Sequence, residues 1–206
     1  MNVANFYFTH NPFLAKNLIR VLNDGYIRLG KDLPEKFRML SGDQPNENIY
    51  GHIYFDDMTT IPYLWGYSII LHPKILYDIG VTYYEGWGGE NAIKINKHSS
   101  MPTMKNKLMQ IRKSLSKLYD EKKKHELPYP YRHEILFDKK ISLRKYAIAV
   151  SCDMCSDEMY EKIKKLVANK KYNIVIIRRH AKDGDDINKI FHPPTLNEIL
   201  SKIQKK

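Results

Sequence analysis

The fold of this chain is decided by residues 133–151, which read HEILFDKKISLRKYAIAVS. Two runs rich in apolar and β-branched residues, 134–137 and 145–151, predict two strands, and the polar residues 138–140 between them predict a turn. The first strand opens on an acid, Glu134. An acid gains nothing evident at the start of an otherwise apolar strand, so Glu134 is the first candidate for a chemical role.

The residues that follow predict a helix, a strand and a last helix. Ser156 has the residue type of a helix N-cap, acids occupy the next two positions, and the helix is predicted to run to about Asn169. Residues 172–179 are apolar and β-branched, which predicts a strand. An amphipathic pattern after Pro194 predicts the last helix.

Toward the N-terminus, strands and helices mix without regular alternation. The predicted strands are at 6–9, 26–29, 49–56 and 66–71, with one more irregular strand within 80–95. A long loop is predicted at 30–48, and the predicted helices are at 12–25 and 101–126. The residues of the second helix predicted to face the core are Met104, Leu108, Ile111, Leu115 and Leu118. We therefore expect an α+β fold, with residues 1–206 forming a single domain.

Composition limits the class of protein. Hydrophobic residues make up 43% of the 206 residues, which excludes a disordered chain. No apolar run approaches the roughly 18 residues that a membrane span needs. Only two cysteines are present and the N-terminal residues do not read as a signal peptide, so we expect a cytoplasmic protein that does not bind membranes.

The chain is basic, with 34 Lys and Arg against 23 Asp and Glu and a formal net charge of +11. Such a charge attracts a polyanion such as DNA or RNA. The AT-rich codon usage that favours Lys over Arg explains the same charge without a partner. Charge alone therefore leaves the nucleic-acid interpretation open.

Three segments carry residue types that suit catalysis. They are FTHN at 8–11, YGHIYFDD at 50–57 and the stretch 133–146 quoted above. Each also has a purely structural explanation. His10 can cap the following helix, Tyr54 can pack on a sheet face and Glu134 can be an exposed strand residue.

In this order, the three segments resemble the ADP-ribosyltransferase superfamily, particularly the branch with a His–Tyr–Glu triad. His10 and the helix that closes at Gly25 are similar to the first motif of poly(ADP-ribose) polymerases. The runs 50–55 and 133–146 are similar to their second and third motifs. The first segment also resembles DarT-type toxins, which modify nucleic acid. In that register Tyr7 stands where the family has an NAD-contacting His, so the first motif is open between His10 and Tyr7.

The resemblance implies a split mixed β-sheet with flanking helices, which binds NAD⁺ as a substrate and needs no metal. It implies that Glu134 holds the nicotinamide ribose and activates the acceptor, that Tyr54 stacks on nicotinamide, and that His10 bonds the adenosine-side ribose. The other residues expected to bind NAD⁺ are Tyr7, Thr9, Asn11 and Gly51. The chain departs from the polymerases in carrying Asn11-Pro12, and not Gly-Ser, after His10.

We therefore expect an NAD⁺-dependent ADP-ribosyltransferase whose acceptor is nucleic acid or, as a close second, protein. By analogy, such an enzyme suits a toxin–antitoxin, phage-conflict or viral setting with an antitoxin or regulatory partner. An RNA 2′-phosphotransferase shares the fold but does not depend on a glutamate. A non-catalytic nucleic-acid-binding module would instead use the Lys-rich helix 101–126. Aromatic residues that could stack on bases or pack on the sheet are Tyr63, Trp65, Tyr83, Tyr84 and Trp87.

The sequence gives little support for a metal site. Cys152 and Cys155 have CxxC spacing, but no second pair follows, and a structural zinc site needs four ligands. We interpret them as an incidental pair at a strand end.

Overall fold

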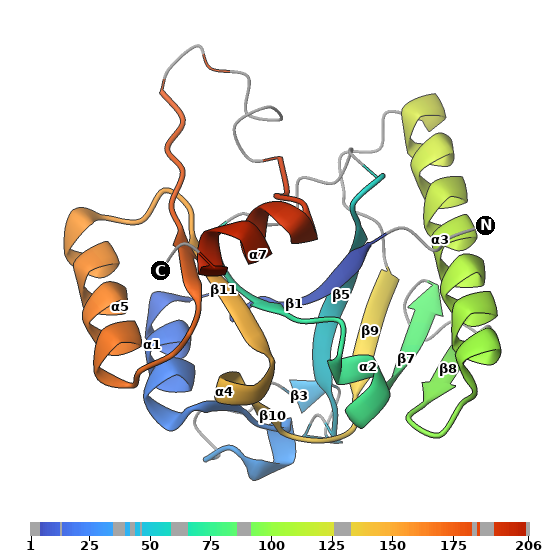
Figure 1. Ribbon diagram of the computed structural model, residues 1–206, viewed down its shortest axis with the longest axis horizontal. Coiled ribbons are helices and arrows are strands. Elements are labelled where there is room, and N and C mark those ends of the chain that lie inside the picture. Colours follow the sequence, from blue (N-terminus) through green and yellow to red (C-terminus); the bar gives the residue numbers. More distant parts are fainter. Residues whose placement is uncertain are drawn as a thin grey trace.

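The computed structural model describes residues 5–12, 14–34, 40–41, 44–45, 47–58, 66–85, 92–125, 133–182, 185 and 192–204. An eight-stranded sheet forms its centre, with the strand order β12–β11–β6–β1–β5–β9–β7–β8 (Figure 1). Its strands are β1 (Phe6–His10), β5 (Ile49–Phe55), β6 (Tyr67–Leu71), β7 (Gly80–Glu85), β8 (Ala92–Asn96), β9 (His133–Phe137), β11 (Ala147–Cys152) and β12 (Val175–Ile177). Neighbouring strands are antiparallel, except that β11 and β12 are parallel. The predicted α+β class with a mixed sheet is confirmed.

Helices and two small sheets surround this centre. The helices of the described residues are α1 (Ala15–Asp24), the 3₁₀ turn η1 (Gly30–Asp32), α2 (Ile75–Asp78), α3 (Met101–His125), α4 (Leu143–Tyr146), α5 (Asp157–Asn169) and α7 (Leu196–Gln204). The small sheets pair β2 (Tyr26–Ile27) with β10 (Ile141–Ser142), and β3 (Leu40–Ser41) with β4 (Gln44–Pro45). Figure 1 shows α1 and α5 at one end of the sheet and α3 at the other, along β7 and β8. No helix among these residues is long and apolar enough to cross a membrane.

The large sheet is split at β5. The C-terminal half of this strand pairs with β1, where Tyr54 lies opposite Tyr7, and its N-terminal half pairs with β9, where Gly51 lies opposite Ile135. The exchange of partners happens at Gly51. A Cβ atom there would collide with the carbonyl oxygen of Thr9, so only glycine allows β1 and β5 to approach this closely.

Register and alternation divide the residues of the sheet between two faces. One face, called the Phe8 face, carries Phe8, Ile53 and Ile135. The other, called the Glu134 face, carries Glu134 and the residues that share its parity on the neighbouring strands. Helix α3 covers the Phe8 face at β7, where the Tyr83 hydroxyl lies 3.0 Å from Ser114 Oγ.

Several predicted elements are confirmed by the structure. In α3, the predicted inward residues Met104, Leu108, Ile111 and Leu115 are buried, while the side chain of Leu118 lies outside the described residues. Ser156 caps α5, because its Oγ accepts a hydrogen bond from the backbone N–H of Met159.

Other predictions were wrong in extent. The single strand predicted within 80–95 is an antiparallel pair, β7 and β8, and the long loop predicted at 30–48 contains η1, β3 and β4. The helix predicted from Pro12 begins at Ala15. The strands predicted at 26–29, 145–151 and 172–179 are shorter at one or both ends, because 3₁₀ or helical turns and loops replace their outer residues.

Candidate active site

Glu134 lies on an interior strand of the sheet, β9, between β5 and β7. The strand alternates strictly: His133, Ile135 and Phe137 are buried, while Glu134 and Leu136 are half-buried. His133, Ile135 and Phe137 thus lie on the Phe8 face, and the Glu134 carboxyl lies on the other. Burial raises the pKa of the Glu134 carboxyl above its usual range, which makes it a stronger proton acceptor when ionised.

Two phenols flank this carboxyl. Tyr84 on β7 lies directly opposite Glu134, and Tyr50 on β5 lies on the same face, opposite Leu136. Burial and, next, the charge of Glu134 raise the pKa of Tyr50, and Tyr84 adds to this shift. The three side chains therefore form one electrostatically coupled group on three adjacent strands.

A neutral imidazole lies further along β5, where this strand leaves β9. His52 has the same parity as Tyr50, and its Nδ1 lies 3.2 Å from the backbone carbonyl oxygen of His133. Burial lowers the pKa of His52, which favours the uncharged ring. The His52 ring packs edge-on against the His133 ring, with the two centroids 5.2 Å apart.

His10 is linked to Tyr50 by a hydrogen bond to its backbone. Its Nδ1–H donates to the carbonyl oxygen of Tyr50 over 2.9 Å, which leaves Nε2 as an acceptor. Burial lowers the pKa of His10, and the nearby Arg20 acts in the same direction. By alternation His10 has the parity of Phe8, so it lies at the split of the sheet and not on the Glu134 face.

Tyr7 and Tyr54 form a buried pair further along the Glu134 face. They are register partners, their rings stack with centroids 5.4 Å apart, and they are 1% and 3% exposed. Burial strongly raises the pKa of Tyr7, and its hydroxyl makes no hydrogen bond to any described residue. One side of the Tyr54 ring is thus occupied by Tyr7. The first motif was open between His10 and Tyr7. Of these two residues, Tyr7 lies on the Glu134 face and His10 does not.

The remaining expected residues lie where β1 ends. Thr9 is fully buried, and its hydroxyl donates to Asn11 Oδ1 over 3.3 Å. Asn11 Nδ2 in turn donates to Ser68 Oγ over 2.9 Å. Thr9, Asn11 and Gly51 therefore line the split of the sheet, next to His10.

The sequence interpretation did not assign Tyr50, His52 or Tyr84 to the site. The first two occupy alternate positions with Tyr54, so the period of two within YGHIY could have indicated that all three share a face. Tyr84 was one of five aromatic candidates for stacking. Of the others, Tyr83 is buried under α3, and Tyr63, Trp65 and Trp87 lie outside the described residues.

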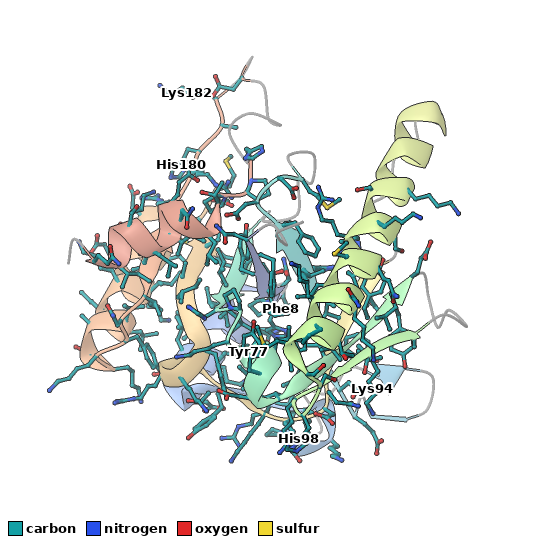
Figure 2. The ribbon with its side chains drawn as sticks, turned by 45° about the vertical axis from the view of Figure 1, so that its right-hand side comes forward. Phe8, Tyr77, Lys94, His98, His180 and Lys182 are labelled. Carbon is teal, nitrogen blue, oxygen red and sulfur yellow. The ribbon has the colours of Figure 1, made fainter. Side chains whose placement is uncertain are left out.

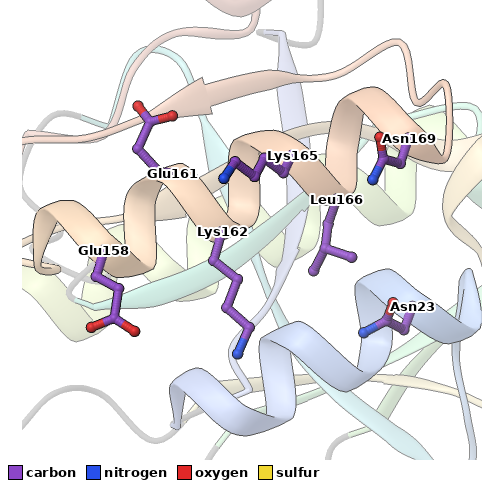
Figure 3. Close-up of a pocket in the computed structure, with 7 residues that line it drawn as sticks. All are labelled: Asn23, Glu158, Glu161, Lys162, Lys165, Leu166 and Asn169. Atoms are coloured by element: carbon purple, nitrogen blue, oxygen red, sulfur yellow. The ribbon is translucent and has the colours of Figure 1, made fainter.

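No group of three or more His, Cys, Asp or Glu residues that could hold a metal occurs within the described ranges. Cys152 and Cys155 are buried and free. A surface pocket of about 390 Å³ lies between α1 and α5 (Figure 3), and its lining residues are Asn23, Glu158, Glu161, Lys162, Lys165, Leu166 and Asn169. This pocket contains no residue of the Glu134 face.

Comparisons with known proteins identify relatives. A family model described as a family of unknown function (DUF5846) matches residues 3–118. Uncharacterized protein R11 of Acanthamoeba polyphaga mimivirus is 32% identical over 213 residues, which cover 96% of this chain and 76% of that protein.

Among solved structures, the chain is similar to Thermus sp. 2.9 DarT. The complex with carba-NAD⁺ matches 86% of this chain and 97% of that chain, with 13% identity and a TM-score of 0.47. The complex with ADP-ribosylated ssDNA matches 86% and 98%, with 10% identity and a TM-score of 0.44.

Proposed function

This chain belongs to the family of unknown function DUF5846, and we propose that it is an NAD⁺-dependent ADP-ribosyltransferase with Glu134 as its catalytic carboxylate. The observation that carries the proposal is the position of Glu134. Glu134, the acid that the motif resemblance identifies, is half-buried on an interior strand of the sheet, with Tyr50 and Tyr84 on the two neighbouring strands. We propose that residues 1–206 act as one catalytic domain.

The chemistry of this group suits cleavage of a glycosidic bond. In the transfer, the bond from the ribose C1″ to nicotinamide breaks and nicotinamide leaves with the electron pair. The acceptor atom forms the new bond to C1″ and gives up its proton. Glu134 has two tasks in this step: its charge stabilises the positive charge that develops on the ribose, and its raised pKa suits it to take the acceptor proton.

The residues around the split fit a polar, extended substrate. Tyr7 and Tyr54 would form the inner wall of the NAD⁺ site, and the buried Tyr7 hydroxyl is available as a donor. His10 would accept a ribose hydroxyl at Nε2, because its Nδ1–H is held by Tyr50. Thr9, Asn11 and Gly51 would complete the contacts at the end of β1, where Gly51 allows β1 and β5 to approach closely.

We propose nucleic acid as the acceptor, because the formal net charge of +11 attracts a polyanion. An enzyme that modifies nucleic acid endangers the cell that makes it. A cytoplasmic toxin of this kind, held in check by an antitoxin or regulatory protein, is the setting that we infer.

The direct test is nicotinamide release from NAD⁺ in the presence of separate DNA, RNA and protein acceptors. Glu134→Gln should lower the rate by about 10²- to 10³-fold, because it removes both the charge and the proton acceptor. Glu85→Gln is the matched control, since Glu85 lies on the adjacent β7 but bonds Ser114 of α3 on the other face. Turnover unchanged in Glu134→Gln would refute the assignment, and RNA 2′-phosphate transfer that survives this substitution would favour the phosphotransferase alternative.

A further inference from the structure

Beyond Glu134, the same face continues across three strands as an accessible surface. We call this surface, on β9, β7 and β8, the platform, and its residues are Glu134, Leu136, Thr82, Tyr84, Ala92, Lys94 and Asn96. All of them are half-buried or exposed, whereas Val81, Tyr83, Ile95 and Ile135 between them are buried. The apolar half of each strand is thus used by the core, and the platform is left to solvent.

The platform carries an aromatic ring and a cation at a spacing that suits a nucleotide. Tyr84 is the direct cross-strand partner of Glu134, a relation that puts their Cβ atoms about 5 Å apart. Lys94 on β8 lies opposite Thr82, diagonal to Tyr84 at about 7 Å.

The strand order places this surface on one side of Glu134 and the expected NAD⁺ residues on the other. Tyr7, Thr9 and Tyr54 belong to β1 and β5, whereas Tyr84 and Lys94 belong to β7 and β8. Glu134 on β9 separates the two groups. A carboxylate that serves both the leaving bond and the attacking atom has to stand between donor and acceptor, and the sheet provides this arrangement.

We propose that the platform is the acceptor subsite and that it binds single-stranded nucleic acid, with one unpaired base stacked on Tyr84 and a backbone phosphate at Lys94. This inference rests on the proposed function. An unpaired base is required because a base inside a duplex exposes only its edges, while stacking needs its flat face. A base on Tyr84 brings its nucleophilic atom beside Glu134, which receives the proton as the bond to C1″ forms.

The Lys-rich helix α3 is the competing surface. Lys105, Lys113 and Lys117 are exposed on it, but α3 packs on the Phe8 face, opposite Glu134. Nucleic acid bound there would not present a base to the carboxylate. Lys94 on β8 and Tyr77 on α2 lie on separate elements (Figure 2), which allows variants of the platform to be compared with variants elsewhere.

The test is binding of a fluorescent single-stranded oligonucleotide by the full chain without NAD⁺, followed by anisotropy. Tyr84→Ala should weaken binding by about 10-fold or more, and Tyr84→Phe should stay within about twofold of the wild type, because stacking needs the ring and not the hydroxyl. Lys94→Glu should weaken binding and reduce the slope of log affinity against log salt by about one. Tyr77→Ala, which removes a 43% exposed tyrosine outside the platform, is the control.

The outcomes separate this inference from the proposed function. Wild-type binding through Tyr84 and Lys94 without any NAD⁺ turnover would support the platform and refute the transferase. NAD⁺ turnover with oligonucleotide binding lost only in Lys105→Glu, Lys113→Glu or Lys117→Glu would overturn the platform. Equal affinity for duplex and single strand, or transfer to protein alone, would overturn it as well.

Discussion

The Glu134 face has two halves that differ in how they meet solvent. In the half formed by β1 and the end of β5, Tyr7, Thr9 and Tyr54 are buried. In the half formed by β9 and β7, Glu134 and Tyr84 are accessible. Both halves are polar, so polarity does not distinguish them, and accessibility does. Under the proposed function, the buried residues of the first half would form the wall of the site, and the accessible residues of the second would take part in the chemistry.

The buried half has a specific anchor beside it. Arg179 pairs with the buried Asp153 through Nε at 2.9 Å and Nη2 at 2.5 Å, and it donates to the His192 carbonyl oxygen ahead of α7. At the start of α7, the Leu196 N–H donates to Asp56 Oδ1 over 2.8 Å. These contacts hold α7 near Tyr7. After burial, the charges of Asp56 and Glu198 raise the pKa of Tyr7 and that of Arg179 lowers it.

The largest expected effect comes from breaking that anchor. Arg179→Ala leaves the carboxylate of Asp153, whose side chain is 0% exposed, without its guanidinium, and should cost about 3–5 kcal/mol of unfolding free energy. Urea denaturation measures it. Asp157→Ala is the control, because it breaks an ion pair in which Asp157 is 93% exposed and should cost about 1 kcal/mol or less. Equal losses of unfolding free energy in the two variants would mean that the buried ion pair stabilises the fold no more than the exposed one.

Gly51, at the boundary between the halves, should rank next. A Cβ atom at this position meets the backbone of Thr9, which cannot move without displacing β1, so Gly51→Ala should cost about 2–3 kcal/mol. Gly66→Ala places its Cβ in open space, although φ there is +76°, and should cost about 1 kcal/mol. Thermal unfolding compares the two. A smaller loss for Gly51→Ala than for Gly66→Ala would contradict the close approach of the strands.

The buried imidazole beneath the accessible half predicts a dependence on pH. Burial lowers the pKa of His133 from 6.5 to about 3, with His52 adding to the shift. In the unfolded chain His133 therefore binds a proton below pH 6.5, whereas in the folded chain it binds one only below about pH 3. Stability is fully present above this window and should fall on acidification by about 1.4 kcal/mol per pH unit.

Urea unfolding at pH 7 and pH 5 measures this slope. His133→Phe should reduce it and leave the contributions of His10 and His52, whose pKa values are lowered in the same direction. A slope identical to that of the wild type would show that His133 does not titrate as expected.

The smallest expected effect on stability concerns Tyr7. Its buried hydroxyl has no hydrogen bond within the described residues, so Tyr7→Phe should leave the unfolding free energy unchanged or raise it by up to about 1 kcal/mol. Tyr83→Phe, which removes a hydroxyl 3.0 Å from Ser114 Oγ, should instead lose about 1 kcal/mol. If the Tyr7 hydroxyl binds NAD⁺, Tyr7→Phe should raise KM for NAD⁺. A stability loss equal to that of Tyr83→Phe, with KM unchanged, would argue against this role.

Local signals predicted part of this architecture well. The apolar spacing in α3 and the N-cap at Ser156 depend on neighbouring residues only, and both predictions are confirmed. The pair β7 and β8 was predicted as one irregular strand, because aromatic residues alternate with glycines along 80–95 and the turn signal of Gly88-Gly89 was not used. Strand ends at β11 and β12 were also overextended, since propensity does not sense where a partner strand stops.

Residue types and their order along the chain were enough to single out Glu134 as the acid worth testing, since an apolar strand with one carboxyl is visible without any partner. Which side chains meet that carboxyl was a matter of pairing between distant segments. The register of β1 on β5 puts Tyr7 on the same face as Glu134 and leaves His10 at the split. The register of β7 on β9 puts Tyr84 directly opposite Glu134. A shift of one residue in either register reverses every side chain of a strand, and nothing within a single segment determines that register.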